Sequence, residues 1–175
     1  MRLGFWVPAL ALFFSGCAGY SVGPIKPKLM REVDTIAVSS FQNETLEPRM
    51  EVLLANAVIK QLQQDGTYRI ANEASADALL EGTLQEIDRR PARSVRGNVL
   101  QTREFDLVVR VRYRVVDRVT GKELDARTVT GSSSFFVSGS TDTLSADVNQ
   151  DERQALPLAA EDLAERLVSQ VSEGW

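Results

Sequence analysis

The chain of 175 residues contains no histidine and a single cysteine, Cys17. Histidine is the commonest general base and the commonest zinc ligand, so its absence excludes Ser-His and Cys-His nucleophile arrangements. A lone cysteine supports neither an internal disulfide framework nor a cysteine-rich metal site. We therefore expect a binding protein rather than an enzyme, with no resident metal and no cofactor.

The composition also argues against a Ser-Lys enzyme and against a nucleic-acid-binding protein. Lys60 and Lys122 accompany many serines, but neither lysine lies in a motif that would remove it from water and activate a Ser-Lys pair. The net charge of −4 argues against general nucleic-acid binding. After the N-terminal segment, no apolar stretch approaches the roughly 20 residues that a membrane-spanning helix needs.

The N-terminus has the order of a secretory signal peptide. Arg2 precedes an apolar run over residues 3–14, which is too short to cross a bilayer, and small residues then lead to Cys17. The ending Ser15-Gly16-Cys17 resembles the lipobox of bacterial lipoproteins, although Phe14 stands where that motif usually has leucine. The resemblance implies that residues 1–16 are a lipoprotein signal peptide and that Cys17 is acylated, with palmitate among the expected lipids. An ordinary signal peptide with a chance cysteine is the alternative.

The segment after Cys17 predicts how the protein is held. Two or more acyl chains keep a protein on a membrane essentially permanently, so the remaining chain would be a tethered domain. Ala18 occupies the position where aspartate usually retains lipoproteins at the inner membrane, which favours the outer membrane by the general bacterial sorting rule. Residues 17–32 hold two glycines and two prolines with little periodicity and are predicted to be the lipidated tether. Residues 33–175 are predicted to form a single domain.

The pattern of this domain predicts four long strands and two helices. Apolar residues at helical spacing follow Pro48, and Gly66 suits the end of that helix. The other expected elements are a strand over 33–41, a short strand or edge segment over 68–70, a strand over 77–90, the longest strand over about 99–117, its hairpin partner over 123–137 and a final helix. The stretches 91–97 and 138–148 are predicted to be loops.

The longest predicted strand alternates strictly between two faces. One face is apolar and consists of Leu107, Val109, Val111, Tyr113 and Val115. The other face consists of Val108, Arg110, Arg112, Arg114 and Val116. This second face is too polar to be packed by a helix, so it meets either water or a partner.

The final helix carries one internal conflict. Asn149 and Glu152 are spaced like a capping box, but Pro157 follows within the same apolar pattern and cannot donate to the helical hydrogen-bond ladder. We expect a short first turn, then a break or kink, and a main helix from about Pro157 to Ser172. Its buried stripe is expected to be Leu156, Ala160, Leu163, Ala164, Leu167 and Val171.

The order strand, helix, strand, strand, strand, helix indicates an α+β fold. The first helix is a crossover, so the first two long strands are expected to be parallel and the last three to form an antiparallel meander. Both helices would pack on one face of a four-stranded mixed sheet and leave the other face open.

The same residues resemble a known family. The pattern consists of Cys17 with Gly19-Tyr20, the segment Ile36-Ala37-Val38-Ser39-Ser40-Phe41-Gln42-Asn43-Glu44-Thr45 with Glu47-Pro48, the helix closing at Gly66, Ala76-Asp77-Ala78-Leu79-Leu80-Glu81-Gly82, Asp117 with Thr120-Gly121, and Ala159-Ala160-Glu161-Asp162-Leu163-Ala164. Their joint order resembles the lipopolysaccharide-assembly lipoprotein E family, LptE. The Phe-x-Asn-x-Thr segment alone also resembles curli-secretion and peptidoglycan-synthase-activator lipoproteins.

The resemblance implies a function at the outer membrane. Members of the LptE family sit inside the large barrel LptD as a plug, support its assembly and help pass lipopolysaccharide to the outer leaflet. The expected partners are therefore LptD, lipopolysaccharide and the membrane that holds the lipid anchor, with no nucleic acid. The alternative is a periplasmic adaptor lipoprotein that regulates a cell-envelope synthase or a secretion pore.

Arginines supply the candidate binding residues. Guanidinium is the better planar, bidentate partner for phosphate and carboxylate. One hypothesis is that the four arginines near the predicted loop meet anionic lipid phosphates: Arg89, Arg90, Arg93 and Arg96. The alternative is a solvated surface with cross-strand pairs to Glu81, Glu104, Glu123 and Asp125. For Arg110, Arg112 and Arg114 we expect contact with the barrel wall or simple solvation.

Overall fold

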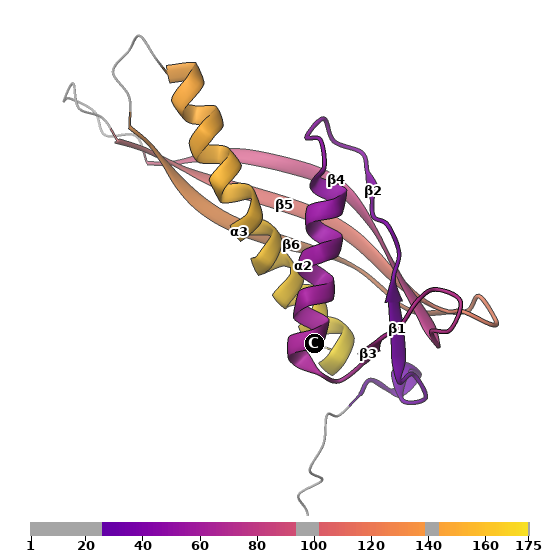
Figure 1. The fold of residues 1–175 in the computed structure, drawn as a ribbon. Coiled ribbons are helices and arrows are strands. Elements are labelled where there is room, and N and C mark those ends of the chain that lie inside the picture. Colours follow the sequence, from indigo (N-terminus) through magenta and orange to yellow (C-terminus); the bar gives the residue numbers. More distant parts are fainter. Residues whose placement is uncertain (1–25, 94–101, 139–143, 175) are drawn as a thin grey trace, which may run out of the picture.

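A computed structural model describes residues 26–93, 102–138 and 144–174 of the protein. Two helices cross one face of a long, curled sheet (Figure 1). The elements in chain order are η2 (Lys28–Met30), β1 (Thr35–Val38), β2 (Gln42–Asn43), α2 (Met50–Asp65), β3 (Arg69–Ile70), β4 (Ala78–Arg93), β5 (Thr102–Asp117), β6 (Glu123–Ser138) and α3 (Leu144–Glu173).

The sheet is mixed, as its sequence pattern predicts. Its strands follow the order β3-β1-β4-β5-β6, and β2 pairs with β4 beyond the end of β1. The strand β1 is parallel to β3 and β4, whereas β4, β5 and β6 form an antiparallel meander. The α+β class is therefore confirmed. The described sheet has six strands rather than the predicted four long ones. The two-residue β3 lies within the short strand or edge segment predicted over 68–70, whereas β2 is too short to show an alternating pattern.

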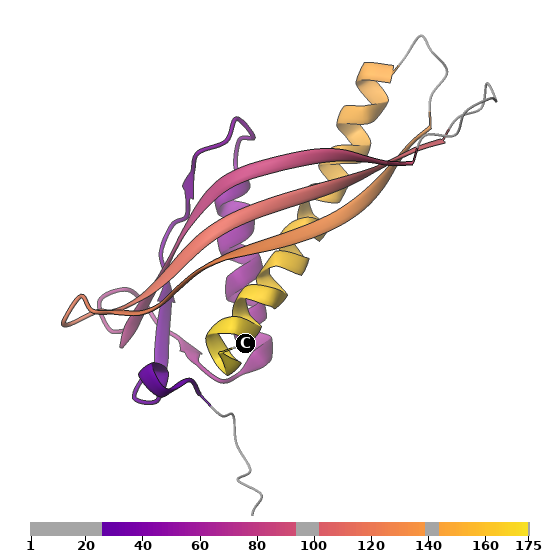
Figure 2. The same ribbon diagram turned by 180° about the vertical axis from the view of Figure 1, so that it is seen from behind.

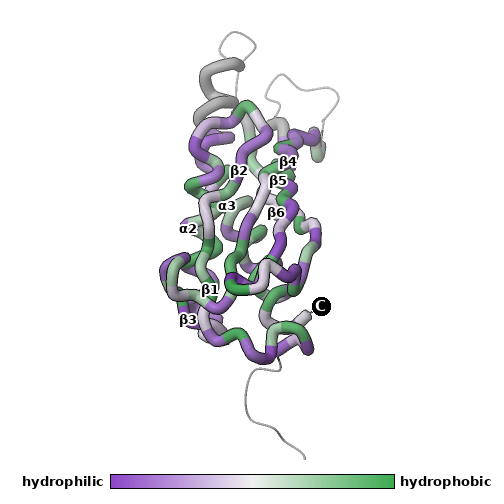
Figure 3. The backbone as a smooth tube through the Cα atoms, turned by 90° about the vertical axis from the view of Figure 1, so that its right-hand side faces the viewer, coloured by the Kyte–Doolittle hydropathy of each residue, from purple (hydrophilic) through white to green (hydrophobic). Residues whose placement is uncertain are grey.

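Both helices lie on the same side of the sheet, and the view from behind shows the other side uncovered (Figure 2). Hydrophilic and hydrophobic residues alternate along the strands (Figure 3), which places one set against the helices. The apolar face of β5 and the predicted stripe of α3 are buried throughout. Full burial of a Leu or Val side chain contributes about 1.5–3 kcal/mol, so this two-helix layer is the main source of stability. Among the described residues, no helix is long and apolar enough to cross a membrane.

The final helix differs from the prediction at its beginning. It starts at Leu144 rather than after a capping box at Asn149, and it continues through Pro157 without a break in the helical assignment. The predicted loop over 138–148 and the predicted main helix from about Pro157 are therefore wrong in their bounds. Pro157 is exposed, and so is Arg153, whose carbonyl loses its helical donor. Water can therefore satisfy that carbonyl, which makes the proline tolerable within the helix.

Close packing of α3 on β6 depends on a glycine. A Cβ added to Gly131 would overlap the carbonyl oxygen of Ala159 and the Cβ of Leu163. Gly82 has a similar role on β4, where an added Cβ would meet the ring of Phe41. These two positions allow the helix backbone and an aromatic ring to lie directly on the sheet.

A β-bulge divides β4 into two halves. The pairing with β5 shifts between Leu84 and Glu86, so one extra residue, Gln85, is inserted into β4. Before the bulge, even-numbered residues such as Leu84 face the helices. After it, Ile87 and Arg89 lie opposite Val109 and Leu107, which are buried under the helices. The bulge therefore directs Arg89 to the helix side of the sheet.

The predicted loop over 91–97 and the predicted tether over 17–32 both differ in part from the structure. The strand β4 extends to Arg93, so Pro91 and Arg93 of the predicted loop are paired with β5. In the predicted tether, Met30 of η2 is buried in the core and Lys26 Nζ donates to the carbonyl oxygen of Val33 at 2.6 Å. Residues 26–32 thus pack on the domain. Residues 1–25, including Cys17, lie outside the described residues.

Candidate functional site

The uncovered face of the sheet carries the three arginines predicted to face a partner, Arg110, Arg112 and Arg114. Two of them are paired with β4: Nη1 of Arg110 lies 2.5 Å from Oε2 of Glu86. Nε of Arg114 lies 2.5 Å from Oε2 of Glu81, as the cross-strand register predicts. Their side chains are about half exposed, and exposed pairs of this kind contribute only about 0–1 kcal/mol each.

Arg112 differs from its two neighbours. It makes no hydrogen bond or ion pair with any other residue that the structure describes, and its side chain is exposed. In the register it lies between two threonines, Thr83 of β4 and Thr128 of β6. The sequence predicts the same environment for all three arginines, because it does not show which acidic residue each one faces.

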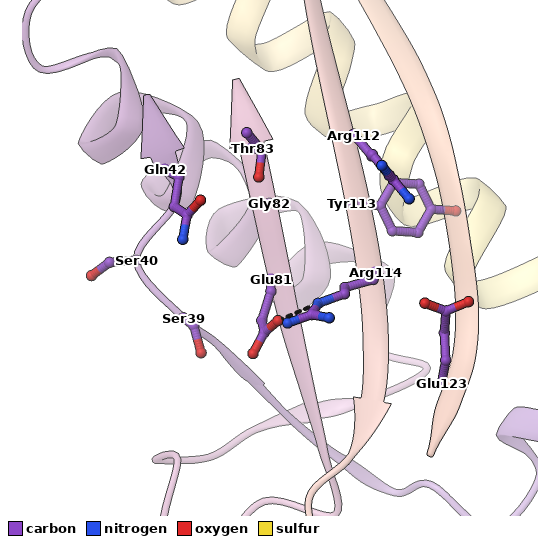
Figure 4. Close-up of a pocket in the computed structure, with 10 residues that line it drawn as sticks. All are labelled: Ser39, Ser40, Gln42, Glu81, Gly82, Thr83, Arg112, Tyr113, Arg114 and Glu123. Carbon is purple, nitrogen blue, oxygen red and sulfur yellow. Dashed lines mark hydrogen bonds and ion pairs between the residues drawn. The ribbon is translucent and has the colours of Figure 1, made fainter. Parts of the chain in front are cut away.

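A polar groove of about 450 Å³ surrounds Arg112 on this face (Figure 4). Its lining residues are Ser39, Ser40, Gln42, Glu81, Gly82, Thr83, Arg112, Tyr113, Arg114 and Glu123. The connection between β1 and β2 supplies the serines and Gln42, and the long strands supply the charged side chains. The groove therefore combines hydroxyl, amide, guanidinium and carboxylate groups on a rigid sheet.

Only two of the four charged residues in the groove form an ion pair with each other. Glu81 and Arg114 neutralise each other, whereas neither Arg112 nor Glu123 pairs with a charged group within the described part of the chain. The groove therefore offers one uncommitted cation and one uncommitted anion at separate places. Sequence reasoning placed Glu123 among the acids paired with arginines, and the structure does not place it in such a pair.

The arginines at the other end of β4 occupy different environments. Nε of Arg89 donates to Oε1 of Glu152 at 2.6 Å, and its Nη2 also approaches Glu47. The hydrogen bond and charge of Glu152 raise the pKa of Arg89, so this guanidinium is held on the helix side of the sheet. Arg90 faces the open side and pairs with Asp88, with Nε and Oδ2 2.7 Å apart.

The remaining members of the predicted lipid-binding set are only partly described. The backbone of Arg93 pairs with Glu104 at the end of the β4–β5 ladder. Arg96 lies outside the described residues. The structure thus brings Arg90 and the groove to the same open face but turns Arg89 away from it.

Two buried tyrosines on the helix side of the sheet have a structural role. The hydroxyl of Tyr113 donates to Oδ2 of Asp125 at 2.9 Å, and burial is the main cause that raises its pKa. The hydroxyl of Tyr68 donates to the carbonyl oxygen of Val171 at 3.1 Å, and burial raises the pKa of Tyr68 to about 12. Both groups therefore stay neutral at ordinary pH. Tyr68 links the segment after α2 to α3, and Tyr113 also donates to Oε1 of Gln170, which links the sheet to α3.

A turn built on Asn43 and Thr45, the residues at which the sequence predicts a turn, precedes α2. Asn43 accepts hydrogen bonds from the backbone N–H and the hydroxyl of Thr45, and its amide donates to the Glu47 carbonyl oxygen at 2.8 Å. Leu46 is fully exposed at the tip, and Arg49 has a φ of 68°. The sequence signal for this turn was Asn43 followed by Thr45, which are typical turn residues.

The described residues include no cluster of three or more carboxylate or thiol side chains that could hold a metal ion.

Comparison with known proteins agrees with this architecture. A sequence model of the LptE family, described as lipopolysaccharide-assembly, matches residues 33–171. No curated protein matches the chain.

Several solved structures share the fold at low sequence identity. The PelC dodecamer of Paraburkholderia phytofirmans is 19% identical, with a TM-score of 0.52 over 87% of this chain and 96% of that chain. A minor lipoprotein of Acinetobacter baumannii is 19% identical, with a TM-score of 0.51 over 81% and 94% of the two chains. A hypothetical protein of Chlamydia trachomatis is 12% identical, with a TM-score of 0.54 over 80% and 96%.

Proposed function

Because the chain belongs to the LptE family of lipopolysaccharide-assembly proteins, we propose that it plugs and supports an LptD barrel during lipopolysaccharide transport to the outer leaflet. In this proposal the protein is an outer-membrane lipoprotein, anchored through acylated Cys17, and it has a binding role rather than a catalytic one.

The observation that carries this proposal is the long polar face without helices. Two of its arginines, Arg110 and Arg114, are balanced by cross-strand ion pairs. The strand β6 adds a row of exposed hydroxyl side chains: Thr128, Thr130, Ser132 and Ser134. The interiors of outer-membrane barrels are polar and are often plugged, so a surface of this kind suits a wet lumen. The opposite side of the sheet supplies the core that makes the plug compact.

A lipid anchor would assist the same function. A tether at Cys17 confines the domain to the membrane that holds the barrel, which raises the effective concentration of each partner for the other. Residues 26–32 pack on the domain, so the tether proposed for residues 17–32 would contribute its reach through the residues before Lys26.

The lipid-binding part of the proposal concerns Arg89, Arg90, Arg93 and Arg96. Arg90 is exposed on the open face, so a phosphate reaches it by displacing only the carboxylate of Asp88. A phosphate at Arg89 has to compete with Glu152, whose carboxylate is nearly buried. We therefore expect charge reversal at Arg90 to weaken lipopolysaccharide binding more than charge reversal at Arg89 does in variants that fold.

The proposal is tested by affinity isolation of the lipidated protein from detergent-solubilised outer membrane, with mass spectrometry of co-purifying proteins. Recovery of an LptD barrel in about equal amount supports the plug function. Isolation without a barrel, or with a synthase, a secretion pore or further copies of the same chain, overturns it and favours the adaptor function.

A further inference from the structure

Resting on the proposed function, we infer that the groove around Arg112 binds an extended segment of the barrel partner that carries one acidic and one basic side chain. The acidic side chain binds Arg112, and the basic side chain binds Glu123. Arg110 and Arg114 stay paired with carboxylates of β4 and do not contact the segment.

Arg112 is the available guanidinium on this face. A partner carboxylate that binds Arg110 or Arg114 has to displace Glu86 or Glu81 from an existing ion pair. A carboxylate that binds Arg112 displaces only water, since no other described residue pairs with it. Arginine–carboxylate contacts are frequently bidentate, which gives geometric specificity as well as binding energy.

The surroundings of Arg112 suit a carboxylate. Thr83 lies directly across the β4–β5 register and lines the same groove, and Thr128 lies opposite on β6. A threonine hydroxyl can donate to a carboxylate oxygen that the guanidinium leaves free. On the wall formed by the β1–β2 connection, Ser39, Ser40 and Gln42 offer further polar groups for the main chain of a segment (Figure 4).

Glu123 places a negative charge in the groove at some distance from the positive charge of Arg112. It lies opposite Val116 in the β5–β6 register, which is four residues along β5 from Arg112. Four residues of extended chain span about 13 Å, and side chains four apart point to the same side of a strand. An extended segment with an acid and a base four residues apart therefore reaches both uncommitted charges at once.

The charge balance favours such a segment over a phosphate group. Arg112 and Arg114 are matched by Glu81 and Glu123, so the four charged side chains of the groove sum to zero. A phosphate at Arg112 would leave Glu123 without a cation, because it carries no positive charge. A segment with one charge of each sign complements both ends of the groove, and like-charge contacts would reject segments of the reverse order.

The test uses the full-length lipidated chain, co-expressed with the LptD barrel of its own organism. The amount of barrel co-purified is compared for wild type, Arg112→Glu, and the double variant Arg112→Glu/Glu123→Arg, which keeps the groove's net charge but reverses its direction. The matched control is Arg153→Glu, an equal charge change on an exposed position of α3. We expect both groove variants to recover at least tenfold less barrel than wild type and the control to recover as much as wild type.

The outcomes separate this inference from the proposed function. If wild type recovers no barrel, the proposed function fails. If wild type recovers the barrel and both groove variants recover it equally well, the inference is overturned and the proposed function stands. A loss as large in Arg153→Glu also overturns it, because the effect would then not belong to the groove.

A second measurement does not depend on whether the charge-reversal variants fold. A photo-crosslinking amino acid at Thr83 is expected to capture a barrel peptide that contains an acid and a base four residues apart. Capture of a barrel peptide without that pattern, or no capture from a complex that forms normally, overturns the inference.

Discussion

Arg89 of β4 and Glu152 of α3 form an ion pair between the sheet and the helix, with Nε and Oε1 2.6 Å apart. The two ends of this pair differ in exposure: 9% of the Glu152 side chain is accessible, but 45% of the Arg89 side chain is. The nearly buried carboxylate thus depends on the arginine far more than the arginine depends on the carboxylate.

Removal of either partner is expected to show this asymmetry. Arg89→Ala leaves a nearly buried carboxylate without its cation and is expected to cost about 2–4 kcal/mol of unfolding free energy. Glu152→Gln leaves a half-exposed guanidinium in water and is expected to cost about 1 kcal/mol. Urea unfolding followed by circular dichroism measures both. As a control, Lys60→Ala at the exposed Lys60–Glu161 pair is expected to change stability by less than about 1 kcal/mol. Equal losses for Arg89→Ala and Glu152→Gln would contradict the asymmetry.

Gly131→Ala tests the close approach of α3 to β6. The added methyl group overlaps the Ala159 carbonyl and Leu163, so α3 has to move off the sheet. Overpacking of this kind costs roughly 1–3 kcal/mol, which thermal unfolding detects as a lower Tm. Thr130→Ala, on the open face of the same strand, is the control with an expected change of less than about 0.5 kcal/mol. A Gly131→Ala protein as stable as wild type would show that the helix packs less closely than described.

Pro157→Ala tests the continuity of α3. Alanine restores the helical hydrogen bond to the Arg153 carbonyl and is the better helix former, so stability is expected to rise by about 1–3 kcal/mol. The measurement is the Tm of the variant beside that of Leu158→Ala, an exposed neighbour on the same helix. A lower Tm for Pro157→Ala would instead mean that the proline bends α3 into a shape that the curled sheet requires.

The carboxylate of Asp77 predicts a pH dependence. It accepts hydrogen bonds from the hydroxyl and backbone N–H of Thr35 and from the N–H of Asp34, and these hold the pKa of Asp77 below its usual range. A pKa that is lower in the folded state makes a stabilising contribution above the unfolded pKa, which is lost as pH falls through the folded pKa. Stability measured from pH 7 to pH 3 is therefore expected to fall less steeply in Asp77→Asn than in wild type. Parallel curves for the two proteins would exclude Asp77 as a source of acid sensitivity.

Cys17→Ser tests the lipid anchor. Serine cannot form the thioether that precedes lipoprotein cleavage, so the variant is expected to lose incorporation of labelled palmitate and to leave the membrane fraction. Ser15→Ala keeps a small residue before the cysteine and is expected to behave like wild type. Unchanged palmitate labelling in Cys17→Ser would show that lipid is attached elsewhere, and a wild type without palmitate would show that residues 1–16 are an ordinary signal peptide.

The parts of the fold that sequence reasoning predicted are those with long, regular patterns. Leu107 through Val115 alternate without interruption, and the apolar stripe from Leu156 to Val171 has one helical phase, so their buried faces were predicted correctly. The strand β2 contains only two residues, and two residues carry no periodicity. It exists because β4 offers hydrogen-bond partners, which is a tertiary property.

The candidate site was predictable as a face but not as a set of contacts. Arg112 and its neighbours were expected on the open side because they alternate with apolar residues. Arg112 alone among the three lacks a partner because the register with β4 places it opposite Thr83, whereas the bulge at Gln85 brings Glu86 opposite Arg110. The same bulge turns Arg89 toward Glu152, a residue that local spacing had indicated as a helix cap.

The length of the three long strands can be compared with the height of a barrel's apolar band. Each contains 16 residues, and 16 residues of extended chain measure about 50 Å, whereas the apolar band of an outer-membrane barrel is about 25 Å tall. A sheet of this length standing upright in a barrel is roughly twice as long as the band. In that orientation one end of the protein would lie near lipid headgroups while the other still reached into the periplasm, so a single rigid body would connect the two aqueous sides of the membrane.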